Sequence, residues 1–148
     1  MYVGLKHLHS GLPYLLLLAI LVVLVLSLIG IFNKTEFDAK RKKAVLFAMI
    51  LFHLQWTVGL ILYFVSPMVK SIGNAMSDST DRLYALEHPL MMTIALVFVT
   101  LARFKSKKTD DYAMNLNVFL FFALALACII FCLPESWAAL RMFDSSPS

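Results

Sequence analysis

The chain has 148 residues, of which 61% are hydrophobic, and a formal net charge of +4 at pH 7. A soluble domain is roughly 45–50% apolar, so this composition excludes an ordinary soluble domain and favours a membrane protein with one domain. The chain has no glycine-rich phosphate loop and no segment in which basic and aromatic residues alternate. We therefore expect no nucleic-acid partner, and the lipid bilayer is the first partner that the sequence predicts.

The hydrophobic residues gather in four runs, each able to form a helix that crosses about 30 Å of bilayer hydrocarbon. The first predicted helix covers about residues 12–32 and follows a short polar lead. It is longer than the ~7–15-residue apolar region of a signal peptide, so we expect it to be retained. Pro13 is placed in its first turn, where proline is tolerated. The second predicted helix covers about residues 44–65 and has polar residues near its middle.

The third predicted helix covers about residues 83–102 and is the least regular of the four. Its uninterrupted apolar part is only about 20 Å long at ~1.5 Å per residue, which is too short for the bilayer core. To span the membrane, this helix must include Glu87 and His88. The alternative is that it begins at Pro89 and that the preceding residues lie in the membrane interface. The fourth predicted helix covers about residues 113–133.

These runs predict an all-α fold, a polytopic four-transmembrane-helix up-and-down bundle that forms a single domain over residues 1–148. Nine of the 13 Lys and Arg residues lie in the loops at 33–43 and 103–112. The positive-inside rule places both loops in the cytoplasm. The N- and C-termini are then expected on the periplasmic or outer face of the membrane.

Several ionisable residues lie within or beside these helices, where they are costly and by default suggest a function. With the expected topology, His53 lies about 18 Å from the outer surface and His88 about 7–8 Å from it. Pro89 is expected to free the carbonyl of Ala85 and to kink the helix, which would turn His88 into the bundle. The depths separate an outer group, which is His7, His9, Glu87 and His88, from an inner group, which is His53 with Gln55 and Trp56. His53 and Trp56 are three residues apart and share a helix face, whereas Gln55 points elsewhere.

Four roles suit these side chains. Two imidazoles at similar depth on facing helices can bind a haem iron. A mixed set of nitrogen and oxygen ligands, drawn from His7, His9 and His88 with Glu87, suits Cu or Zn. Histidines at two depths also suit a proton path or the head group of a quinone. The fourth role is hydrogen bonding between helices, which contributes about 0.6 kcal/mol per bond in a bilayer.

Three segments carry a resemblance to a known family: LKHLHSGLPYLLLL at 5–18, HLQWTVGLILYFVSP at 53–67 and EHPLMM at 87–92. They resemble a small bacterial family of cytochrome-b-like four-helix membrane proteins. More distantly, the pattern is similar to one half of haem A synthase and to the cytochrome b561 bundles. The resemblance covers the first three helices and is weakest over the fourth.

The resemblance implies a bacterial inner-membrane protein that binds haem b and takes part in electron or proton transfer near its outer face. The alternative is a non-enzymatic accessory subunit that packs against a larger membrane complex or a second copy, with its histidines as interhelical hydrogen-bonding residues. The resemblance names His53 and His88 as candidate haem ligands, with His7 or His9 as alternates. The candidate cofactor site is completed by Glu87 and Trp56.

Overall fold

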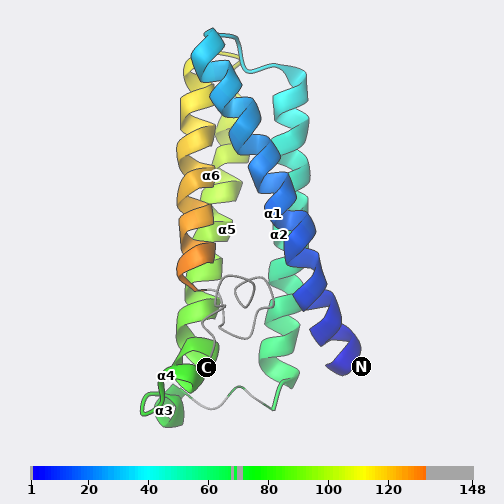
Figure 1. The fold of residues 1–148 in the computed structure, drawn as a ribbon, viewed down its shortest axis with the longest axis vertical. Helices are drawn as coiled ribbons and strands as arrows, with labels where there is room; N and C mark the ends of the chain where they lie inside the picture. The colour runs from blue at the N-terminus through cyan, green and yellow to red at the C-terminus, as the bar shows by residue number, and fades with distance from the viewer. Residues whose placement is uncertain (1, 68, 70–71, 133–148) are drawn as a thin grey trace, which may run out of the picture.

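A computed structural model describes residues 2–67, 69 and 72–132 of the chain (Figure 1). In this part of the chain there are four helices long and apolar enough to cross a membrane, and there is no strand. The predicted all-α four-helix bundle is confirmed, and the chain is an integral membrane protein. The elements are α1 (Tyr2–Asn33), α2 (Ala39–Val65), α3 (Ile72–Ala75), α4 (Ser79–Arg82), the π-helix η1 (Leu83–Glu87), α5 (His88–Ser106) and α6 (Ala113–Phe131).

The four long helices form a closed bundle in chain order. The third of them is the continuous helix Ser79–Ser106, made of α4, η1 and α5. Helix α1 packs against α2 and α6, and α5 packs against the same two helices from the other side. Successive long helices run in opposite directions, and α1 crosses the others obliquely (Figure 1). We call the end with the connections at 34–38 and 107–112 the loop end, and the end with Tyr2 and Phe131 the cavity end.

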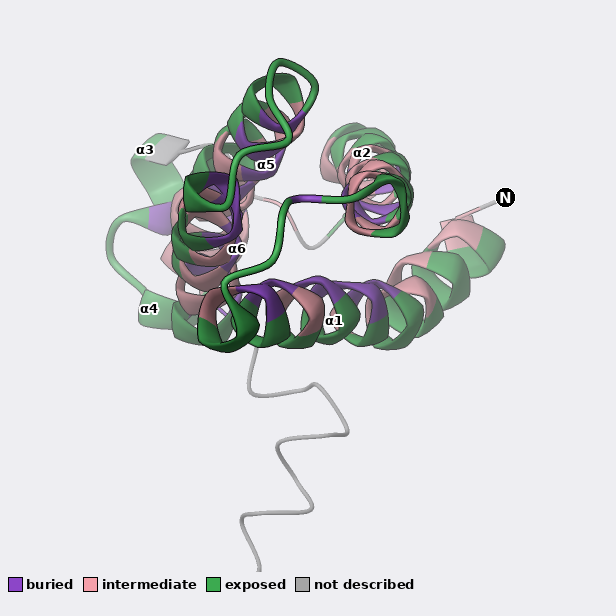
Figure 2. Cartoon of the chain, turned by 90° about the horizontal axis from the view of Figure 1, so that it is seen from above, coloured by how far each residue is buried: buried purple, intermediate pink, exposed green. Residues whose placement is uncertain are grey.

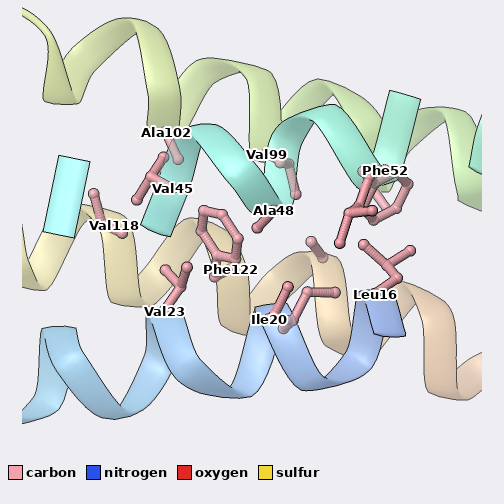
Figure 3. Close-up of a cluster of buried hydrophobic side chains, with 14 of the residues drawn as sticks. Leu16, Ile20, Val23, Val45, Ala48, Phe52, Val99, Ala102, Val118 and Phe122 are labelled. Carbon is pink, nitrogen blue, oxygen red and sulfur yellow. The ribbon is translucent and has the colours of Figure 1, made fainter. Parts of the chain in front are cut away.

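The core is a layer of aliphatic and aromatic side chains from all four long helices (Figure 3). Ala48, Ala95 and Ala102 are fully buried, and such small residues let membrane helices approach closely. The helix faces that point away from the core carry large exposed apolar residues, such as Leu18 at 58% exposure (Figure 2). A surface this apolar suits lipid and not water. The labelled core residues are Leu16, Ile20, Val23, Val45, Ala48, Phe52, Val99, Ala102, Val118 and Phe122.

Polar contacts close the loop end. The Arg41 guanidinium donates to the carbonyl of Leu26 at 3.0 Å and to Oγ1 of Thr35 at 3.1 Å. The buried Asn115 side chain donates to the carbonyls of Thr35 and Tyr112 at 2.8 and 3.0 Å. These bonds join the first loop to the last helix. The helices are therefore fixed to one another at this end.

Packing is looser toward the cavity end. The first buried residue of α1 is Leu16, although the helix begins at Tyr2, and the first buried residue of α5 is Ala95. Side chains in the first four turns of α1 and the first two turns of α5 are consequently free to border a cavity. The candidate histidines of both helices lie in these stretches.

Three helix starts differ from the prediction. The third spanning helix begins at Ser79 and not near residue 83, because the Asp78 side chain caps it by accepting from the backbone amides of Thr80 and Asp81. Helix α1 begins at Tyr2 and not near residue 12, so the polar lead is helical. The placement of Pro13 in a first turn is wrong, because this proline lies inside α1. A single proline removes one backbone donor, and no other strong helix breaker precedes it. Helix α2 begins early, at Ala39, because the Asp38 side chain caps it by accepting from the backbone amide of Arg41 at 3.0 Å.

The third spanning helix includes Glu87 and His88, as its length requires. The alternative, a helix that begins at Pro89, is excluded by the continuous run from Ser79 to Ser106. Helix α6 ends at Phe131, and the predicted end at residue 133 lies outside the described residues.

Candidate functional site

A cavity of about 580 Å³ lies at the cavity end, between α1, α2 and α5. Small-molecule and cofactor sites occupy roughly 300–1,000 Å³, so its size suits a cofactor. Its inner wall is apolar and includes Leu16 and Phe52. Its outer rim is polar and includes Tyr2, Lys6 and Ser66. The cavity therefore changes from polar to apolar along the bundle axis.

Pro89 shapes the α5 side of the cavity. Proline has no amide hydrogen, so the carbonyl of Ala85 loses its α-helical partner. The preceding turn is a π-helix, in which the amide of His88 donates to the carbonyl of Leu83, and such turns often occur at functional sites. The hydroxyl of Tyr63 on α2 donates to the freed carbonyl of Ala85 at 3.0 Å. A side chain of α2 thus satisfies the carbonyl that the proline leaves unpaired.

Pro13 has the same effect on α1. It frees the carbonyl of His9, four residues earlier. Nε2 of Gln55 on α2 donates to this carbonyl at 2.9 Å and lies 3.0 Å from Nδ1 of the His9 ring. Each proline on the cavity wall is therefore matched by one polar side chain of α2, and Gln55 also holds the ring of His9.

The ring of His88 is anchored by a different helix. Its Nδ1 donates to the carbonyl of Cys132 at 2.8 Å. Cys132 caps the C-terminus of α6, where carbonyls lack helical partners. Since a carbonyl only accepts, Nδ1 of His88 carries the hydrogen, and a neutral ring then has a lone pair on Nε2.

His9 and His88 face each other across the cavity. Their ring centres are 6.4 Å apart, and the ring planes are nearly perpendicular, at 83°. Gly59 on α2 makes room for His9, because a Cβ at this position would lie 2.8 Å from Cε1 of the ring. Two histidines far apart in the sequence are thus held on opposite walls of one cavity.

The other predicted site residues lie in different surroundings. Trp56 borders the cavity and donates from Nε1 to the hydroxyl of Thr93 at 3.1 Å. His53 is half-buried, donates from Nδ1 to the carbonyl of Met49 in its own helix, and does not line the cavity. His7 is exposed on α1 and is also outside the lining.

Glu87 does not reach the cavity either. Its carboxylate pairs with Nε of Arg82 at 2.6 Å, and both side chains are about two-fifths exposed. The charge expected to be costly in the membrane is thus paired and partly open to solvent or head groups. Within the described residues, no group of three or more His, Cys, Asp or Glu side chains could hold a metal ion. The structure therefore does not assemble His7, His9, His88 and Glu87 into a Cu or Zn site.

Three residues of the site were not predicted: Pro13, Gly59 and Tyr63. Gln55 was grouped with His53 and Trp56 by depth but was assigned to another face of the helix. In the structure Gln55 and Trp56 both border the cavity, and His53 does not. The signal that could have pointed to Gln55 and Tyr63 is the pair of prolines inside apolar runs, because each proline leaves a carbonyl that needs a donor from a neighbouring helix.

Comparison of the chain with protein-family models, with curated proteins and with solved structures finds no match.

Proposed function

We propose that this membrane protein binds haem b in the cavity and transfers electrons there, in the manner of a b-type cytochrome. The observation that carries the proposal is the pair His9 and His88, which come from different helices and face each other at 6.4 Å in a cavity of cofactor size. A histidine whose Nδ1 donates to a carbonyl is oriented to bind a metal through Nε2. His88 has this arrangement, so it would be the better ligand of the two.

The remaining walls suit the same cofactor. Haem b supplies a one-electron redox couple when bound, and the surrounding polarity tunes its potential. Leu16, Phe52 and Met92 line the cavity and would exclude water from the iron. Lys6 lies on the polar rim, where its ammonium group would pair with the carboxylate groups of the cofactor. The proposed site thus has an apolar depth and a cationic mouth.

The topology sets where electrons would enter and leave. Under the positive-inside rule, the basic loop end faces the cytoplasm of a bacterial inner membrane and the cavity end faces the periplasm. A redox partner would then approach from the periplasmic side or from within the outer leaflet.

The test is a haem titration of the detergent-purified protein, followed by its Soret absorption. His88→Ala should weaken haem binding by at least about tenfold, since changes even to supporting residues of a metal site cost ~10–100-fold. His53→Ala is the matched control, because His53 is also half-buried and also donates from Nδ1 to a carbonyl, but lies outside the cavity. It should bind haem as the wild type does. Equal binding by the wild type and His88→Ala would contradict the proposal.

A second candidate is the accessory subunit, whose histidines only hold helices together. It is favoured by the fact that the bonds of both histidines run between helices, from α1 to α2 and from α5 to α6. Such a protein would be colourless after expression with a haem precursor, and it would co-purify with a larger membrane complex. His88→Ala would then lower only its stability.

A further inference from the structure

We infer that Gln55 holds His9 as a hydrogen-bond donor toward the cavity, so that the two facing histidines have different roles. His88 presents a lone pair and is the metal ligand. His9 presents an N–H group and is a positioning residue for whatever lies opposite His88. The consequence at the iron rests on the proposed function, whereas the hydrogen positions themselves do not.

The first step concerns the orientation of the Gln55 amide. One of its terminal atoms lies 2.9 Å from the carbonyl oxygen of His9, which is free because Pro13 has no amide hydrogen. A carbonyl oxygen only accepts hydrogen bonds. The atom that faces it must therefore be the amide nitrogen, since an amide turned by half a revolution would place two acceptor oxygens against each other.

The second step concerns the ring of His9. The same amide nitrogen lies 3.0 Å from Nδ1 of His9. This nitrogen has two hydrogens, one for the carbonyl and one for the ring, so Nδ1 of His9 is an acceptor. A neutral imidazole with an acceptor at Nδ1 carries its hydrogen on Nε2. His9 and His88 are thus opposite tautomers.

The third step concerns what keeps this arrangement in place. The oxygen Oε1 of Gln55 is buried and has no hydrogen-bond partner within the described residues. The two hydrogen bonds of the amide nitrogen therefore fix the orientation of the amide, although its oxygen stays unpaired. Gly59 allows the His9 ring to lie against α2, because any side chain there would meet it. Two residues of α2 consequently hold the ring in place.

The consequence is a site with one protein ligand and one facing donor. The distance of 6.4 Å between ring centres would let both rings reach one metal. His9, however, offers no lone pair on Nε2 while Gln55 donates to Nδ1. A metal held by His88 would then have one histidine ligand, with the N–H group of His9 beside it.

The tautomers can be tested without any haem. The full chain, labelled with 15N-histidine and reconstituted in lipid, gives separate nitrogen chemical shifts for protonated and unprotonated ring nitrogens. His9→Ala and His88→Ala assign the signals. The expected result is a hydrogen on Nε2 of His9 and on Nδ1 of His88. A hydrogen on Nδ1 of His9 would overturn the inference.

The role at the metal is tested with haem-loaded protein by its visible absorption spectrum, which separates one histidine ligand from two. The wild type and His9→Ala should both show one histidine ligand. Gln55→Leu removes the donor to Nδ1 of His9, frees Nε2 as a second ligand, and should show the spectrum of two histidine ligands. The same substitution in the His9→Ala background is the control and should change nothing.

The outcomes separate the two proposals. A wild-type protein with two histidine ligands, or a Gln55→Leu protein that keeps the single-ligand spectrum, would overturn the inference and leave haem binding intact. A wild type that takes up no haem would defeat the proposed function, and the nitrogen shifts would still decide the tautomers.

Discussion

Tyr63→Phe isolates the contribution of one α2 side chain to the π-helical turn that precedes His88. The hydroxyl of Tyr63 donates to the carbonyl of Ala85 at 3.0 Å. Pro89 has no amide hydrogen and cannot donate to this carbonyl. Ala85 is only 2% exposed, so water does not replace the lost donor. Side-chain hydrogen bonds in a bilayer average about 0.6 kcal/mol and reach about 1.7 kcal/mol, and a buried unpaired carbonyl costs roughly 1–3 kcal/mol. We expect a destabilisation of about 1–2 kcal/mol.

The measurement is the free energy of unfolding in mixed micelles, with sodium dodecyl sulfate as the denaturant. Tyr112→Phe is the matched control, because it makes the same chemical change at a residue that is 40% exposed at the loop end. Its effect should stay within about 0.5 kcal/mol, as for most surface substitutions.

A double-mutant cycle with Pro89→Ala tests whether the bond from Tyr63 matters because Pro89 lacks an amide hydrogen. Alanine at this position supplies the missing amide hydrogen, so the carbonyl of Ala85 gains a backbone partner. In that background Tyr63→Phe should cost less than about 0.5 kcal/mol, which gives a coupling of roughly 1 kcal/mol. If Tyr63→Phe costs the same with and without Pro89, the two residues do not share this carbonyl and the reasoning fails.

Two glycine substitutions probe other close contacts. Gly59→Ala places a Cβ 2.8 Å from the His9 ring, against 3.4–4 Å for an ordinary contact, so the ring must shift by about 0.5 Å and the nitrogen chemical shifts of His9 should change. Gly11→Ala, with nothing within 4 Å, should add up to ~1 kcal/mol of helix stability and leave those shifts unchanged; unchanged His9 shifts in Gly59→Ala would contradict the packing. The methyl group of Gly30→Ala would overlap the buried side chain of Asn115 and should lower the free energy of unfolding by about 1–3 kcal/mol. An unchanged free energy of unfolding would show that the loop end repacks freely.

Helix existence and order followed from the apolar runs, because every run long enough to span the membrane forms a helix. The starts of α1, α2 and the third spanning helix did not follow, since the criterion was hydrophobicity and not helix formation. Tyr2 to Gly11 and Ala39 to Lys43 are polar or mixed, yet nothing in them stops a helix from extending beyond the apolar run. Pro13 was assigned to a first turn for the same reason.

The candidate site was predictable in part. Helix length placed Glu87 and His88 inside a spanning helix, and depth placed His88 nearer to His9 than to His53. The donors to the freed carbonyls were not predictable, because Gln55 and Tyr63 reach them only after α2 has packed between α1 and α5. Pairing between helices depends on relative rotation and tilt, which hydropathy does not report.

The visible absorption spectrum of the wild-type protein, expressed with a haem precursor and purified in detergent, tests the central claim most directly. The proposed site between His9 and His88 predicts a coloured protein with about one haem per chain and a Soret band that shifts on reduction with dithionite. A correctly folded preparation that stays colourless after titration with haem would contradict it.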